Sequence, residues 1–210
     1  LAGDAGSFVG TGGMITKINA AEITVSHGID MIISNGAKPE LLYDIAEGTI
    51  TIDGVPIEKI ARKELRSNIA MVLQDTHLFT GTVMENIRYG RLDATDEEVY
   101  KAAKIANAYD FISRLPEGFN TMLTSDGANL SQGQRQLLSI ARATVKDAPV
   151  MILDEATANI DTETEVLIQD SLEKMKNIGT MLIVAHRLST IQHCDNIILL
   201  DQGQIVEQGN

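Results

Sequence analysis

Aromatic residues and cysteine are scarce in this chain, and both shortages narrow what it can be. Phe, Trp and Tyr together make up 4% of its 210 residues, with no Trp, so we expect a core of aliphatic side chains. The single cysteine, Cys194, cannot form an internal disulfide, which is typical of a protein in a reducing compartment. No apolar run approaches the ~18 residues needed to cross a bilayer, and the start shows no secretory signal.

Basic residues are also few: 17 Lys and Arg stand against 29 Asp and Glu, which gives a formal net charge of −12. A protein that binds nucleic acid through its phosphates needs clustered Lys and Arg, so the composition argues against a nucleic-acid partner. The apolar fraction of 44% allows a sizeable core, and the length suits one domain or two small ones. One further absence is specific: the chain contains no Gly-x-x-x-x-Gly-Lys-Ser/Thr, the loop that commonly cradles nucleotide phosphates.

The chain divides into two unequal pieces, 1–47 and 48–210, that meet near Glu47 and Gly48. In the first piece we predict a glycine-rich loop over 10–17, a strand over Ile29–Ile33 and a helix from Pro39 to about Ala46. In the second piece, apolar runs predict strands over Thr49–Ile52, Ile69–Leu73, Val150–Leu153, Thr180–Val184, Asn196–Leu200 and Gln204–Val206. Capping boxes predict helices from Thr95 to about Ala108, from Ser131 to about Val145 and from Thr162 to about Met175. Apolar strands that alternate with helices predict an α/β fold with a mainly parallel sheet.

Two acidic residues, Asp154 and Glu155, follow the apolar strand Val150–Leu153 directly. The strand would carry both to the carboxyl edge of the sheet, where ligands bind in such folds. Asp154 could hold Mg²⁺, and Glu155 could orient or polarise an attacking water. Taken alone, an acidic pair after a strand is equally consistent with a cap on the next element.

Ser131, Gln132, Gly133 and Gln134 stand where a helix is predicted to begin. The exposed amides and the dipole of a helix start attract anions, and Gly133 would let a phosphate approach the backbone. An ordinary capped helix is the simpler interpretation of these residues by themselves.

Two polar residues lie at the ends of other predicted strands: Gln74 after Ala70–Leu73, and His186 after Met181–Ala185. Gln74 could reach Mg²⁺ or a water, and His186 could hydrogen-bond a γ-phosphate. Each alone would be unremarkable, and His186 would read as a surface histidine.

Together these residues match one family in order and spacing. From about Gly48 to Asn210 the chain resembles the ATP-binding domain of ABC transporters, especially exporters. The matching positions are Gln74 for the Q-loop, Leu130–Gln134 for the signature sequence, Val150–Glu155 for the Walker B strand, Ala158–Asp161 for the D-loop and His186 for the switch histidine. The resemblance implies a partial P-loop NTPase core with a helical subdomain, which uses ATP and Mg²⁺. Gln132 replaces the glycine of the commonest signature, and we expect this variant to be tolerated.

The resemblance also implies partners, because two such domains pair head to tail and each ATP lies between the phosphate loop of one and the signature of the other. Gln74, Asp154, Glu155 and His186 would serve an ATP held by this chain's own phosphate loop, which is missing. Ser131–Gln134 and Asp161 would serve an ATP held by the partner. Residues 74–86 would face a membrane domain, which would place the chain on the cytoplasmic side of the cell membrane.

The first piece resembles glutamate 5-kinase, of the amino-acid kinase family, over about Leu1–Glu47. Thr11, Gly12, Gly13 and Lys17 match the loop that contacts ATP in that family, with the lysine near the phosphates. Most of that kinase fold is absent from these residues, so we expect a loop that has lost its scaffold. This piece would then be a fragment of foreign origin. Its strand and helix over Ile29–Ala46 could occupy the position of the missing phosphate-loop segment in the core.

Three interpretations follow. In the first, the chain is the ATP-binding domain of an exporter that is catalytically defective alone, because its phosphate loop is missing. In the second, it is a non-catalytic partner that donates its signature motif to an intact domain. In the third, it is a fusion relic or an assembly artefact without activity. The sequence therefore leaves open whether the chain is an enzyme.

Overall fold

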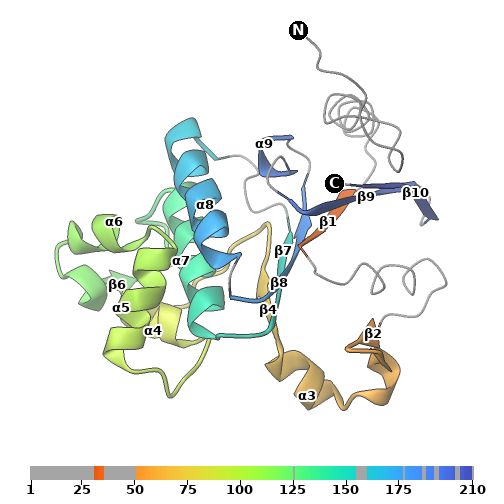
Figure 1. Ribbon diagram of the computed structural model, residues 1–210. Coiled ribbons are helices and arrows are strands. Elements are labelled where there is room, and N and C mark those ends of the chain that lie inside the picture. The colour runs from red at the N-terminus through yellow and green to blue at the C-terminus, as the bar shows by residue number, and fades with distance from the viewer. Residues whose placement is uncertain are drawn as a thin grey trace, which may run out of the picture. The chain divides into compact units, whose positions relative to one another are not determined.

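The structure is a computed structural model that describes residues 31–35, 51–124, 126–154, 160–176, 178–185, 188–191, 194–201 and 204–209 (Figure 1). The chain divides into two compact units, one made of residues 1–59 and 183–210 and the other of residues 60–182. Both units contain strands, and the helices that carry the predicted signature and D-loop residues belong to the second unit. The chain therefore has the expected mixed α/β fold.

Antiparallel strands form the first unit. β1 (Met31–Asn35) pairs with β9 (Asn196–Asp201), and β9 pairs with β10 (Gln204–Gly209), with a register shift between Ile205 and Glu207. β1 covers the described part of the predicted strand Ile29–Ile33 and continues to Asn35, with Ser34 paired with Asn196. The predicted helix from Pro39 to Ala46 lies outside the described residues.

A small hairpin and two short helices complete the described part of this unit. β2 (Thr51–Ile52) and β3 (Val55–Pro56) are joined by Asp53 and Gly54, which have φ of 50° and 78°. Two successive residues with positive φ are what a two-residue hairpin requires, which explains the Asp-Gly pair. The 3₁₀ helix η1 (Ile57–Lys59) follows, and α9 (Leu188–Ile191) precedes β9.

Parallel pairing appears in the second unit, as predicted. β4 (Ile69–Val72) and β7 (Val150–Asp154) run parallel with Ile69 opposite Val150, and β8 (Thr180–Val184) follows β7 in the strand order. Alternate residues of β4 and β7 are buried, as two-residue periodicity demands. Both α7 (Gln132–Val145) and α8 (Thr162–Met175) begin near the residues predicted from the capping patterns.

The rest of the second unit is mostly helical and packs around α7, which contacts α4, α5, α8 and β4 (Figure 1). Its other elements are α3 (Arg62–Ser67), β5 (Gly81–Thr82), α4 (Val83–Arg88), α5 (Asp96–Ile105), α6 (Tyr109–Ser113), η2 (Gly118–Asn120) and β6 (Met122–Leu123). The capping box at Thr95 and Glu98 is confirmed. The helix ends at Ile105, not Ala108, because Asn107 has a φ of 52° and stops it.

The start of α8 differs from the prediction in its cap. Asp161, not Thr162, is the N-cap residue: its carboxylate accepts hydrogen bonds from the amide (2.9 Å) and the hydroxyl (2.8 Å) of Thr164. Asp161 and Thr162 are both of residue types favoured at an N-cap, but only Thr162 has a glutamate three positions later, at Glu165. The cap forms at Asp161, which agrees with the rank of Asp above Thr as an N-cap.

Among the described residues, no helix has the length and apolar character that a bilayer crossing requires.

Candidate functional site

A hollow of about 350 Å³ lies in the second unit between the end of β4 and the first turns of α7. Its walls come from three stretches of chain: residues 74–77, the loop at Asp126 and Ala128, and Gln132, Arg135 and Gln136 of α7. Gln74 and Gln132 therefore line the same space, although we expected them to serve two different nucleotides. The hollow is open and polar on the α7 side, since Gln132 is exposed.

Gln74 and Asp154 lie at the same edge of the sheet. β4 and β7 are parallel with Val72 opposite Leu153, so the next residue of β7 is Asp154, and Gln74 follows two residues after Val72. Asp154 is half-buried and Gln74 is exposed. Carboxylate and amide oxygens are ligands that Mg²⁺ accepts, usually with phosphate oxygens and waters to complete the octahedron.

The donor set fits a shared magnesium ion but not a site made by protein alone. In the described part of the chain, no three His, Cys, Asp or Glu side chains cluster in a way that could hold a metal. Asp154 and Gln74 would supply at most two oxygen ligands, so the ion would need phosphate oxygens as well. This agrees with a magnesium ion that arrives with a nucleotide.

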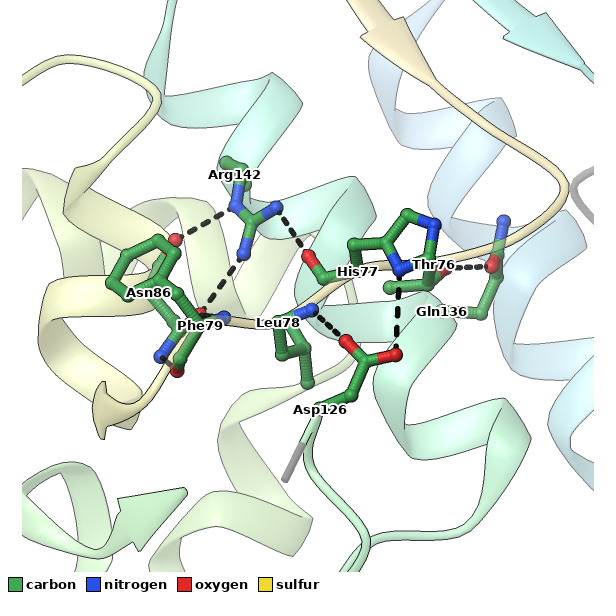
Figure 2. Close-up of polar contacts among 8 residues, drawn as sticks. All are labelled: Thr76, His77, Leu78, Phe79, Asn86, Asp126, Gln136 and Arg142. Atoms are coloured by element: carbon green, nitrogen blue, oxygen red, sulfur yellow. Dashed lines mark hydrogen bonds and ion pairs between the residues drawn. The ribbon is translucent and has the colours of Figure 1, made fainter. Parts of the chain in front are cut away.

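Gln136 fixes the chain on both sides of Gln74 and Asp75. Its amide oxygen accepts a hydrogen bond from the hydroxyl of Thr76, and its amide nitrogen donates to the carbonyl oxygen of Leu73 (3.4 Å). Gln136 is 3% exposed and Figure 2 shows it meeting Thr76 from α7. No sequence pattern indicated this role, because a glutamine shortly after a helix start is normally interpreted as a surface residue.

Asp126 holds the next two residues of the same segment. Its carboxylate accepts the amide of Leu78 (2.7 Å) and lies 3.3 Å from Nδ1 of His77 (Figure 2). The Leu78 amide is the main reason that the pKa of Asp126 is below its usual range, and His77 and Arg135 add to the effect. The carboxylate therefore stays ionised and ties this segment to the loop before α7.

Arg142 of α7 connects the same segment to α4. Its guanidinium donates to the carbonyl oxygens of His77 and Asn86, both at 2.9 Å, and to Oδ1 of Asn86 at 3.1 Å (Figure 2). It also lies 5.6 Å from the ring centre of Phe79 and 5.9 Å from that of Tyr89. Burial lowers the pKa of Arg142, but an arginine remains charged at any ordinary pH. Among the described residues, its partners are neutral acceptors and aromatic rings, and the sequence did not point to it.

The start of α7 has the predicted capping box. Ser131 Oγ accepts from the Gln134 amide (3.1 Å), and the Gln134 side chain accepts from the Ser131 amide (3.0 Å). The Gln134 side chain is therefore engaged in its own helix cap. Ser131 and Gln132 are exposed, so the helix start is open to an anion at these two residues.

Gly133 has a packing role that no local pattern indicated. It is buried, and a Cβ atom placed on it would lie 2.8 Å from both Cβ and Oγ1 of Thr164, with Cγ2 of that residue closer still. The glycine is needed because α8 packs against it, and its predicted contact with a phosphate stays a prediction. Asp161 caps the same turn of α8 and bonds Thr164, which connects the predicted D-loop residue to the signature helix.

The remaining predicted site residues lie outside the described part of the chain. They are Glu155, His186, Thr11, Gly12, Gly13 and Lys17. Among the residues that are described, Gln74, Ser131–Gln134, Asp154 and Asp161 all belong to the second unit. The prediction of their roles stays a prediction.

Comparison with known proteins identifies the family. The family model described as "ABC transporter" matches residues 31–158. The chain is 54% identical over 168 residues to the "Uncharacterized ABC transporter ATP-binding protein YfiC" of Bacillus subtilis (strain 168), covering 80% of this chain and 28% of that protein. It is 49% identical over 168 residues to the "ATP-dependent lipid A-core flippase" of Legionella pneumophila (strain Lens), with 80% of this chain and 29% of that protein covered.

A solved structure of an ABC exporter is also similar to this chain. The "Structure of a bacterial Atm1-family ABC exporter with ATP bound" matches with a TM-score of 0.72 and 43% identity, over 77% of this chain and 28% of the other. The chain belongs to the ABC transporter family. Its mixed α/β fold matches the ATP-binding domain of an ABC exporter, as the motifs indicated. The chain spans less than a third of the length of the ABC relatives and of the ABC exporter described above.

The family match begins at residue 31, inside the piece that we assigned to a glutamate 5-kinase-like fragment. That fragment and its boundary stay predictions. For an ABC transporter domain the use of ATP and Mg²⁺ follows from the family, and the oxygen donors of Gln74 and Asp154 fit that use.

Proposed function

We propose that this chain is the ATP-binding domain of an ABC exporter and that it does not hydrolyse ATP by itself. The family membership supports the first part. The second part rests on one observation: the 210 residues contain no Gly-x-x-x-x-Gly-Lys-Ser/Thr. In a P-loop protein the backbone amides and lysine of that loop bind the phosphates, so Gln74 and Asp154 would have no triphosphate fixed in front of them.

The length, capping and exposure of the signature helix favour a second function. In this function the helix would bind a nucleotide that another ABC domain holds. α7 is 14 residues long, its start is capped by Ser131 and Gln134, and Ser131 and Gln132 are exposed. The contact of Gly133 with Thr164 fixes this start against α8. Everything that a helix needs to present its amides to an anion is therefore present without a phosphate loop of its own.

A membrane domain would be a second partner, bound by a different surface. Phe79 and Tyr89 form an edge-to-face pair with ring centres 5.1 Å apart, and they are 38% and 62% exposed. Exposed aromatic pairs are typical of surfaces that bind another protein. The Legionella relative is named a flippase and the similar solved structure an exporter. We therefore propose that residues 74–86, with the neighbouring Tyr89, face such a domain, which would put the chain on the cytoplasmic side of the membrane.

Calorimetry and a phosphate-release assay on the purified chain test the first part. We expect no tight, magnesium-dependent binding of ATP and only background hydrolysis. Glu155→Gln is the control, because Glu155 is the predicted water-orienting residue. If the chain hydrolyses ATP and this substitution abolishes the activity, the proposal is wrong.

Mixing the chain with an intact exporter ATP-binding domain tests the second function. We expect the hydrolysis rate of the intact domain to change on mixing, and the change to disappear with Ser131→Arg, which blocks the exposed helix start. Thr95→Arg is the matched control, because Thr95 caps α5 with the same kind of capping box at another helix start. No change with the unaltered chain would favour a relic without activity.

A further inference from the structure

The helix that carries the signature residues is bonded directly to the segment that carries Gln74. Gln132 and Gln136 are four residues apart in α7, so they lie on one face of the helix, and both line the hollow. Gln132 is exposed, whereas Gln136 is buried and its side-chain amide is hydrogen-bonded to Leu73 and Thr76.

We infer that Gln136 is a positioning residue that holds Gln74 in a fixed place relative to the signature helix. Its two bonds lie on either side of Gln74 and Asp75, so these residues are attached to α7 at both ends. The inference rests on the proposed function in one respect. If a nucleotide of the partner domain binds at Ser131, its binding would change the environment of Gln74 through Gln136.

Two further anchors of this segment act after Thr76 in the sequence. Asp126 accepts a hydrogen bond from the amide of Leu78, and Arg142 donates to the carbonyl oxygen of His77. Loss of Gln136 should therefore loosen residues 74–76 more than residues 77 and 78.

The chemistry of the side chain can be tested because the amide of glutamine serves one partner as an acceptor and the other as a donor. Glutamine accepts from the Thr76 hydroxyl and donates to the Leu73 carbonyl oxygen at the same time. Gln136→Glu keeps the acceptor but loses the donor, and Gln136→Met keeps the length of the side chain but loses both. Thr76→Val removes one bond from the opposite side, and Thr76→Ser retains the hydroxyl.

Backbone ¹⁵N relaxation on the full chain measures the effect. In Gln136→Met we expect the order parameters of Gln74 and Asp75 to fall from about 0.85, typical of rigid backbone, to below about 0.6. Thr76→Val should lower them less, and Thr76→Ser should restore them. Ser139→Ala is the matched control, since Ser139 is a buried polar residue of the same helix. Unchanged order parameters at Gln74, or an equal fall throughout α4, would overturn the inference.

A second measurement separates the inference from the proposed function. Amide chemical shifts of Ser131 and Gln74 are followed while an ATP-loaded intact domain is added. We expect both to shift in the unaltered chain, and only Ser131 to shift in Gln136→Met. A shift at Ser131 without one at Gln74 in the unaltered chain would refute the coupling. No shift at Ser131 would refute the donation of the signature helix and the coupling with it, while the positioning role is decided by the relaxation data.

Discussion

Thr164 of α8 lies so close to Gly133 of α7 that position 133 has no room for a side chain. A Cβ built on Gly133 would be 2.8 Å from Cβ and from Oγ1 of Thr164, a separation that real Cβ atoms essentially never show. Thr164 is itself fixed by two hydrogen bonds to Asp161. The signature helix and the residue matching the D-loop are therefore parts of one packed unit.

Gly133→Ala should destabilise the domain by about 1–3 kcal/mol, because the added methyl group must push apart two packed helices. Combining it with Thr164→Ala removes Cγ2 and Oγ1 from the contact and should recover part of the loss. Urea unfolding of the four proteins of this double-mutant cycle measures both effects. Gln132→Ala, at an exposed position of the same helical turn, should cost much less. If Gly133→Ala is as mild as Gln132→Ala, the packing described here is not what requires the glycine.

Acid should weaken the cap of α8 through Asp161. The Thr164 amide, followed by its hydroxyl, lowers the pKa of Asp161 below its usual range. A carboxyl group with a lowered folded-state pKa contributes stability above its unfolded value of about 3.9, and the contribution is lost as pH falls through the folded value. Asp161→Asn should therefore be less stable than the unaltered chain at pH 5, and the difference should shrink below pH ~3.9.

Thermal melts of both proteins between pH 2.5 and 6 measure this difference. Glu163→Gln removes one negative charge from the same helical turn and serves as the control for charge alone. If the difference in melting temperature between Asp161→Asn and the unaltered chain stays constant over this pH range, the ionised carboxylate is not what stabilises the cap.

Local patterns predicted the elements well where the physical cause is local. The capping boxes at Thr95 and Ser131 form because each is closed by a residue three positions away. The α8 cap was misplaced by one residue because Glu165 completes the capping pattern from Thr162, whereas Asp161 is the residue that caps the helix. The end of α5 could have been predicted from Asn107, since asparagine adopts positive φ more readily than most residues.

The site was predicted less completely, because its polar contacts depend on packing between distant segments. Gln136 and Arg142 look like surface residues of an amphipathic helix, and only their partners near the end of β4 explain why they are buried or half-buried. Gly133 was expected to let a phosphate approach the backbone, and its packing against Thr164 of another helix is a second reason for the glycine, which no local pattern reveals. The motifs themselves identified the family correctly.

Arg142→Lys should be costly even though it keeps the charge. The guanidinium serves three acceptors in two different segments, His77 and Asn86, and a single ammonium cannot reach them in the same geometry. We expect a loss of about 1–3 kcal/mol in the free energy of unfolding. Arg135→Lys is the control, because within the described part of the chain the Arg135 guanidinium donates to one acceptor, the carbonyl oxygen of Leu130. If both substitutions lower the free energy of unfolding equally, the multiple hydrogen bonds of the Arg142 guanidinium contribute little to stability.

Asn107 joins the end of α5 to α8 through its side chain. Its amide nitrogen donates to the carbonyl oxygen of Leu167 (2.8 Å), to Asp170 (2.7 Å) and to Ser171 (3.0 Å), and its oxygen accepts from Lys174 (2.8 Å). Its φ of 52° also lies in the left-handed region, which most side chains avoid. The residue therefore contributes both a polar network and a backbone conformation.

Two substitutions at this position separate the two contributions. Asn107→Gly and Asn107→Ala both lose the side-chain bonds, but only alanine has a Cβ that disfavours a φ of 52°. We expect the alanine variant to be less stable than the glycine variant by about 1–2 kcal/mol in urea unfolding. At Lys101, an exposed position inside α5, the order should reverse, because glycine is the worse helix former by about 1 kcal/mol. The same order at both positions would mean that the left-handed conformation of Asn107 is not what ends α5.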